Sequence, residues 1–239
     1  MTRPTHRLSG APMLVVVPLL ALALHGCGSG TQTNGLERLS AAEVQQRAAA
    51  ALKSAKSVHF SGKSAGGRAS VDVRIQGASS EGTLITAAGR RLAVTRVADA
   101  TYIKASRLAL KALGAPAALS RGGADRWIKL RPQDLTSLRG FSAQDVATQL
   151  TRYDMPVKSS VQQAKLDGEQ VVVIRNRVGS KLYVANTGAA YPLRGEFKGP
   201  DAGRLDFTEY GADFHITAPA HAIDMSKLRR PELKHAAAR

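Results

Sequence analysis

The sequence predicts an α+β fold in which an antiparallel β-sheet packs against a few helices. Short runs with alternating apolar and polar residues recur along most of the chain, as at 58–60 and 71–75. Turn signals such as Gly66-Gly67 and Gly89 separate these runs. Because each run is apolar on one face only, we expect a sheet whose other face meets water, which is typical of antiparallel sheets.

Residues 1–26 are expected to be a signal peptide, because a basic segment precedes an apolar run over 13–24 that is short for a membrane span. Leu24, Gly26 and Cys27, the only cysteine, resemble the processing site of bacterial lipoproteins, the lipobox. We expect Cys27 to become the acylated first residue, carrying diacylglycerol and palmitate. Such chains would anchor the protein to the cell membrane, at its extracytoplasmic face. An ordinary secreted protein and an uncleaved anchor are the alternatives.

The chain is strongly basic, with 34 Lys and Arg against 18 Asp and Glu and a formal net charge of +16. Nucleic acid is not an expected partner outside the cytoplasm, so we expect this charge to face anionic lipid headgroups, wall polymers or acidic glycolipids. The alternative is that the basic charge reflects the general amino-acid composition that the source genome encodes. With its one cysteine acylated, the mature chain has no intramolecular disulfide, so the fold must rest on its apolar core.

The elements are expected in the following order. Residues 27–38, rich in Gly, Ser, Thr and Asn, read as a flexible tether, and a domain follows over 39–222. Ser40 and Glu43 form a capping box that opens an amphipathic helix ending near Lys56. After the strands at 58–60 and 71–75, further strands are expected at 82–87, 91–97, 100–104 and 127–130, with a short helix at 107–113 and a loop at 114–125.

Two short helices are expected to begin at Pro132 and Ser142 before the strands resume. Asp167-Gly168 is the best two-residue hairpin signal of the chain. The remaining expected strands are 157–166, 169–174, 181–186, 191–197, 204–210 and 213–218. Residues 223–239 read as a loose basic tail.

This order of elements resembles the LppX/LprG-type lipoproteins of mycobacteria and other actinobacteria, which have a LolA-like fold. The similar segments are 51–60, 102–104, 127–130, 181–184, 187–194, 207–211 and 216–219. The resemblance implies an unclosed half β-barrel wrapped around a few helices, with an apolar cavity that takes the acyl chains of lipids or glycolipids. It also implies a carrier or chaperone of lipids in the cell envelope, with no catalytic residues and no cofactor.

The resemblance suggests a cavity lined in part by the apolar strand residues, whereas the residues alone allow a core closed by the helix over 40–56. The candidate cavity residues are Val58, Phe60, Val71, Val73, Ile75, Leu84, Val94, Tyr102 and Trp127. The candidate contacts to an anionic headgroup are Arg107, Lys111, Arg121 and Arg126.

Enzyme and metal sites find little support in the residues. Gly62-Lys63-Ser64-Ala65-Gly66 matches G-x-S-x-G, but strands are expected on both sides, where a nucleophile elbow needs a helix after the serine. The histidines left after processing, His59, His215, His221 and His235, are not spaced as metal ligands. A lipoprotein sensor that binds an envelope protein remains the alternative to a lipid carrier. A continuous apolar void would favour the carrier, and a filled core the sensor.

Overall fold

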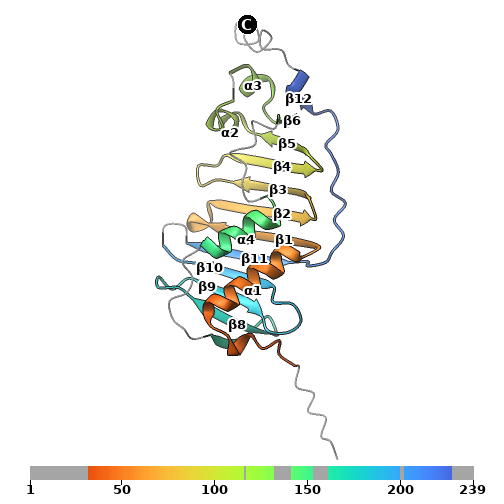
Figure 1. Ribbon diagram of the computed structural model, residues 1–239. Helices are drawn as coiled ribbons and strands as arrows, with labels where there is room; N and C mark the ends of the chain where they lie inside the picture. Colours follow the sequence, from red (N-terminus) through yellow and green to blue (C-terminus); the bar gives the residue numbers. More distant parts are fainter. Residues whose placement is uncertain (1–31, 116, 132–140, 153–160, 200–201, 228–239) are drawn as a thin grey trace, which may run out of the picture. The chain divides into compact units, whose positions relative to one another are not determined.

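The computed structural model describes residues 32–115, 117–131, 141–152, 161–199 and 202–227, which belong to one compact unit (Figure 1). The expected signal peptide, Cys27, the expected helix at Pro132 and His235 lie outside the described residues. Twelve strands form a single sheet in the order β12-β6-β5-β4-β3-β2-β1-β11-β10-β9-β8-β7. The sheet is open, because its end strands do not pair with each other. The expected α+β class with an unclosed, mostly antiparallel sheet is confirmed.

The first half of the sheet is a meander in which consecutive strands pair antiparallel. Its strands are β1 (Ser57–Ser64), β2 (Ala69–Gln76), β3 (Ser79–Ile85), β4 (Arg91–Val97), β5 (Ala100–Ala105) and β6 (Trp127–Lys129). The 3-10 turn η2 (Ala65–Gly67) joins β1 to β2. All six strands fall where the alternating runs predict them, with shifts of a few residues at their ends.

The second half is also an antiparallel meander. Its strands are β7 (Gln162–Leu166), β8 (Glu169–Arg175), β9 (Lys181–Ala185), β10 (Pro192–Phe197) and β11 (Gly203–Thr208). Asp167 and Gly168 have φ values of 51° and 92°, so the predicted hairpin is a turn with two left-handed residues. Strand β11 pairs antiparallel with β1 and so joins the two meanders.

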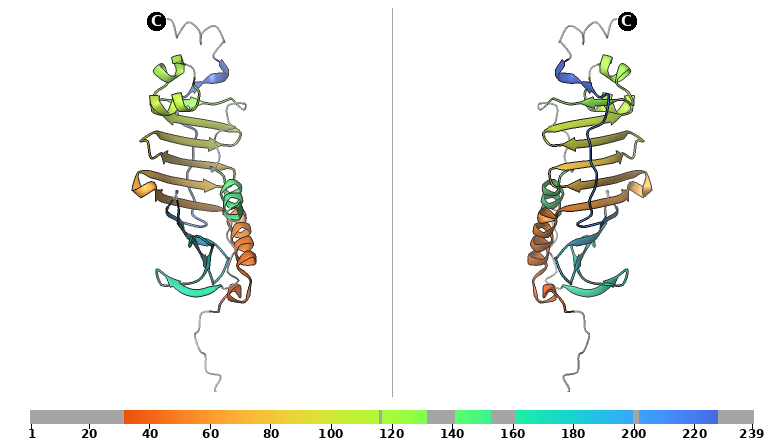
Figure 2. Two further views of the ribbon diagram at one scale, coloured as in Figure 1. Left: turned by 90° about the vertical axis from the view of Figure 1, so that its left-hand side faces the viewer. Right: turned by 90° about the vertical axis from the view of Figure 1, so that its right-hand side faces the viewer.

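Two longer helices lie against one face of the sheet (Figures 1 and 2). Helix α1 (Ala41–Ser54) starts with the predicted capping box, in which Ser40 and Glu43 bond each other's backbone. Helix α4 (Ala143–Arg152) packs along α1, and α1 also contacts β8 and β10. Two short helices, α2 (Arg107–Ala112) and α3 (Ala117–Gly122), stand between β5 and β6.

The expected loop at 114–125 is wrong in part, because it contains α3. Leu119 and Ser120 of this helix are buried, and the Ser120 hydroxyl donates a hydrogen bond to the backbone oxygen of Ala115. Tertiary packing of Leu119 therefore stabilises a turn of helix that has no local periodic signal.

The expected strand at 213–218 is also wrong: these residues carry no strand pairing. Strand β11 already pairs with β1 on one side and with β10 on the other. The segment that follows β11 therefore has no free strand edge beside it. It instead runs as an extended segment from Gly211, whose N–H bonds Ser57, past Gln76, which bonds Asp213 and Phe214. It ends in β12 (Ile223–Asp224), which pairs parallel with β6.

Both ends of the domain extend beyond their expected limits. In the segment expected as a flexible tether, Asn34 bonds the backbone of Ala185, Asn186 and Gly188, and Leu36 is buried in the short helix η1 (Leu36–Arg38). In the expected loose tail, β12 and buried Met225 belong to the domain. A single buried apolar residue flanked by polar ones gives no periodic signal, which is why the sequence misses both.

Candidate functional site

The strand register sorts the sheet residues into two faces. One row of paired residues comprises Phe60, Val73, Gly82, Val94 and Ile103. The apolar residues of this row are buried in the same cluster as the apolar side chains of α1 and α4. We call this side of the sheet the apolar face, and the opposite side, which carries His59, Asp72 and Arg74, the polar face.

Seven of the nine candidate cavity residues lie on the apolar face: Val58, Phe60, Val71, Val73, Ile75, Leu84 and Val94. The other two, Tyr102 and Trp127, are on the polar face. Tyr102 is paired with Thr95 and Lys129, and Trp127 with Lys104. Assigning these two aromatic residues to the same lining is therefore wrong. Because side chains alternate along a strand, an error of one residue in register moves a side chain to the other face.

The apolar face is filled with side chains over most of its area. Val58, Phe60, Val73, Ile75 and Val94 are at most 4% exposed and belong to one continuous core cluster with Val44, Ala48 and Leu52 of α1. These five residues are therefore buried in the core and do not face open space. Val71 and Leu84 are only partly buried and lie beside open space.

That space is a pocket of about 330 Å³ between the sheet and α4. It lies at the ends of β1, β2, β3, β10 and β11, and α4 covers it with Val146, Gln149 and Leu150. The sheet contributes the apolar side chains of Ala69, Val71, Leu84, Phe197 and Leu205, together with Ser64. Apolar side chains dominate this lining, which suits an aliphatic ligand.

Two glycines help to make this space. A Cβ atom on Gly62 would lie 2.2 Å from the backbone oxygen of Arg204, and one on Gly203 would lie 2.2 Å from that of Lys63. Only glycine is small enough where β1 and β11 approach each other this closely. Because glycine has no side chain, neither residue fills the pocket that it lines. Gly62 therefore belongs to a close-packed strand, and Ser64 is followed by η2 and β2. The G-x-S-x-G match has no nucleophile elbow.

Helix α4 is held over the pocket by its ends. The Ser142 hydroxyl caps its first turn by accepting a hydrogen bond from the N–H of Asp145. Val146 and Leu150, four residues apart, share the face that meets the sheet, as their spacing predicts. Buried Gln45 of α1 donates a hydrogen bond from Nε2 to the backbone oxygen of Leu150.

The four candidate headgroup residues are exposed and stand apart from this pocket. Arg107 and Lys111 are in α2, Arg121 is in α3, and Arg126 precedes β6, and none of them is among the lining residues. The basic residues of the lining are Lys63 and Arg204, which sequence reasoning missed. They are paired with each other, and their register directs their side chains to the polar face.

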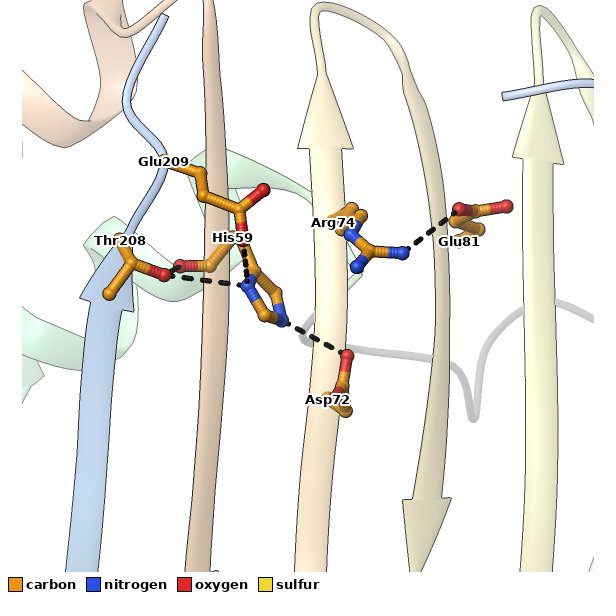
Figure 3. Close-up of polar contacts among 6 residues, drawn as sticks. All are labelled: His59, Asp72, Arg74, Glu81, Thr208 and Glu209. Atoms are coloured by element: carbon orange, nitrogen blue, oxygen red, sulfur yellow. Dashed lines mark hydrogen bonds and ion pairs between the residues drawn. The ribbon is translucent and has the colours of Figure 1, made fainter. Parts of the chain in front are cut away.

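The polar face carries a network of charged side chains (Figure 3). His59 lies between two carboxylates, with Nδ1 3.0 Å from Oε1 of Glu209 and Nε2 3.1 Å from Oδ1 of Asp72. Arg74 and Glu81 on the next strands form a looser ion pair of 3.8 Å. Across the residues that the structure describes, no cluster of three or more His, Cys, Asp and Glu side chains suits a metal ion.

Further along the polar face, Asp206 accepts hydrogen bonds of 2.6 Å from Nε of both Arg194 and Arg204. Partial burial raises the pKa of Asp206, but the bonds from the two guanidinium groups outweigh it and hold the pKa below its usual value. Burial likewise raises the pKa of Glu196. Lys181 and Tyr183 lower this pKa by more than burial raises it, so it lies below its usual value. Burial also raises the pKa of Tyr210, which stacks on Tyr191.

Two further hollows lie on the polar face. One of about 480 Å³ is lined largely by Ser61, Lys63, Ser70, Asp72, Arg204 and Asp206, and one of about 250 Å³ by residues that include Arg74, Glu81 and Trp127. Their charged and hydroxyl-bearing linings suit water or polar ligands rather than aliphatic chains. Within the described ranges, no helix is long and apolar enough to cross a membrane.

No protein-family model and no curated protein matches this chain. Among solved structures, it is similar to LprF from Mycobacterium bovis, at 15% identity and a TM-score of 0.45 over 75% of this chain and 97% of that one. It is also similar to the lipoprotein LppX from Mycobacterium tuberculosis, at 12% identity and a TM-score of 0.45 over 74% and 97% of the two chains.

A DUF1329 family protein from Desulfovibrio piger matches at 10% identity and a TM-score of 0.29, over 74% of this chain and 93% of that one. LppX belongs to the lipoproteins that this sequence resembles. Similarity at this level gives no ligand and no site residue for this chain.

Proposed function

We propose that this protein is a cell-envelope lipoprotein that binds an acyl chain of a lipid or glycolipid in the pocket under α4 and carries or presents it. In this proposal the acylated Cys27 holds the domain at the extracytoplasmic face of the cell membrane. The observation that carries the proposal is the pocket of about 330 Å³, lined mainly by apolar side chains, in a face of the sheet that is otherwise filled.

The size and lining of the pocket favour an aliphatic ligand of modest bulk. Its volume is near the lower end of the range for small-molecule sites, about 300–1,000 Å³. One acyl chain suits it better than several. Burying ten methylenes would contribute ~8 kcal/mol before ordering costs, so affinity requires no catalytic or charged group. Ser64 and Gln149 are the polar side chains available at the lining for the end of the chain.

A second candidate function is a sensor lipoprotein that binds an envelope protein and takes no lipid. The filled core around Val58, Phe60, Val73, Ile75 and Val94 favours this function, because it leaves less room than a carrier of large lipids needs. The two candidates differ in a measurable way. The carrier loses its activity when the pocket under α4 is filled, and the sensor does not.

The test is a pair of substitutions on one face of β2, Val71→Trp and Val73→Trp. Val71 lines the pocket and Val73 is fully buried in the core. Retention of radiolabelled palmitate after delipidation and reloading would be measured together with thermal unfolding. We expect Val71→Trp to lose palmitate with little change in melting temperature. We expect Val73→Trp to overpack the core at about 1–3 kcal/mol and to retain palmitate while folded.

Leu84→Trp, on the neighbouring strand, repeats the test from a second side of the pocket. Palmitate retention at the wild-type level in both Val71→Trp and Leu84→Trp would overturn the pocket assignment. A wild-type protein that retains neither palmitate nor phospholipid would favour the sensor instead.

A further inference from the structure

The antiparallel order of the strands places five connections at one end of the sheet. Ser64 at the end of β1 is paired with Ala69 at the start of β2 and with Gly203 at the start of β11. The β1–β2, β3–β4, β5–β6, β8–β9 and β10–β11 connections therefore all lie at this end. Figure 1 shows α2, α3 and the first two of these connections on the same side of the strands. We call this end the basic edge.

The charges of the described residues are divided between the two ends of the strands. Among the residues that the structure describes, the connections at the basic edge carry the exposed side chains of Arg90, Arg107, Lys111, Arg126, Arg177 and Lys198, and a single carboxylate, Asp125. Asp201, in the β10–β11 connection, lies outside the described residues. At the opposite end, the connections 98–99, 167–168 and 209–222 carry Asp99, Asp167, Glu209 and Asp213 and no Lys or Arg. Lys56, Arg131, Lys165 and Lys227 are basic residues beside them.

The exposed large apolar residues are at the same end. Leu108, Leu113 and Val178 are 65%, 40% and 66% exposed, and they are the large apolar side chains that the described part of the domain leaves in water. Leu108 and Leu113 belong to α2 and its C-cap, and Val178 to the β8–β9 connection. Helix α2 buries Ala109 and Leu110, so Leu108 stands on its outer side between Arg107 and Lys111.

We propose that the basic edge docks on the surface of an anionic lipid bilayer, with α2 placing Leu108 and Leu113 in the interface. Basic side chains interleaved with exposed leucines match the two parts of such a surface, since the phosphates attract the cations and the acyl boundary accepts the apolar side chains. A soluble polyanion would match the charges and leave the leucines in water. The docking is independent of the pocket and of Cys27.

Docking in this orientation would also bring the bilayer to the pocket under α4. This step, unlike the docking itself, rests on the proposed function. The pocket under α4 is lined by Ser64 and Ala69, at the ends of β1 and β2 that belong to the basic edge. A bilayer at this edge would therefore face the pocket, and an acyl chain could move between the two with little exposure to water.

The first test measures binding of the full chain carrying Cys27→Ser to vesicles of phosphatidylcholine, with and without phosphatidylglycerol. We expect Arg107→Gln combined with Lys111→Gln to weaken binding to the anionic vesicles about fivefold for each charge removed. Arg47→Gln combined with Lys53→Gln removes the same charge from exposed positions of α1 and serves as the matched control. An equal loss in both variants would overturn the assignment of the edge.

The second test measures directly whether α2 lies in the lipid interface. Trp127 is the only tryptophan, so Trp127→Phe gives a background in which Leu108→Trp is a single probe. Bromine-labelled lipid in anionic vesicles should quench this probe strongly. A control probe, Ala78→Trp in the exposed β2–β3 turn at the opposite end, should remain unquenched. Equal quenching at both positions, or vesicle binding without quenching at 108, would overturn the proposal; the latter would indicate a site for anions alone.

Discussion

Gln45 of α1 donates a buried hydrogen bond of 2.6 Å to the backbone oxygen of Leu150 in α4. Leu150 is in the last turn of its helix, where carbonyl groups have no partner within the helix. The bond therefore gives a carbonyl group in the last turn of α4 a hydrogen-bond partner. It also fixes this end of α4 to α1, above the pocket. Gln45 is thus a polar side chain on the buried side of α1, where an amphipathic helix ordinarily carries apolar ones.

Replacing Gln45 by Ala should lower the free energy of unfolding by about 1–3 kcal/mol, because the Leu150 carbonyl stays buried without its partner. Denaturant unfolding measures this change. Gln46→Ala, at the exposed neighbouring position, should leave stability almost unchanged. A loss in Gln45→Ala no larger than in Gln46→Ala would show that the bond contributes nothing to the packing of the two helices.

Gly82→Ala should destabilise the sheet. A Cβ atom at this position would lie 2.5 Å from both the backbone oxygen of Asp72 and Cγ2 of Val73, so β2 and β3 must separate to admit it. We expect a loss of about 1–3 kcal/mol, as for other overpacked cores. Gly122→Ala is the control, because a Cβ atom there meets no atom within 4 Å. If both variants had the melting temperature of the wild type, this account of Gly82 would be contradicted.

The Asp206 carboxylate should make stability depend on pH in the acid range. Its pKa is lower in the folded protein than in the unfolded chain, where it is about 3.9. Its contribution is therefore present above pH ~4 and lost as the pH falls through the folded pKa. Asp206→Asn should cost about 1 kcal/mol at neutral pH, and its difference from the wild type should shrink below pH ~4. Asp99→Asn, in an exposed turn, is the control; a constant difference at all pH values would count against this role.

The anchor can be tested apart from the fold. Cys27→Ser should abolish acyl labelling and release the domain from membranes, and it should leave thermal unfolding unchanged, because the buried core begins at Leu36. Labelling with radioactive palmitate followed by membrane fractionation checks both effects. Unchanged labelling would remove Cys27 from the proposal.

Local patterns predicted most of the elements because each strand carries its own alternation and each turn its own residues. The capping box at Ser40, strand β4 and the turn at Asp167 depend on residues close together in sequence, and all three are found as predicted. Helix α3 and the extended segment after Gly211 depend on what they pack against, so no local pattern could identify them.

The candidate site was harder to predict for the same reason. Val71 and Leu84 line a pocket, whereas Val58 and Val73 on the same face are buried under other side chains, and the difference comes from where α4 lies. Leu205 joins them because β11 pairs with β1, a pairing between residues more than a hundred positions apart, and Phe197 joins them through the neighbouring pairing of β10 with β11. Tyr102 shows that an apolar residue in a strand does not by itself reveal which face it occupies.

The pairing of β1 with β11 affects the order in which the domain can form. His59 and Thr208 are partners in this pair and are 149 residues apart, so the ladder closes a long loop. Contacts of such high separation form slowly, and the first meander has only local pairings until they do. Until 203–208 are in place, the outer edge of β1 exposes unpaired backbone groups that another chain can join. Slow closure of this edge would leave the folding chain open to pairing with a second copy for as long as β11 is not in place.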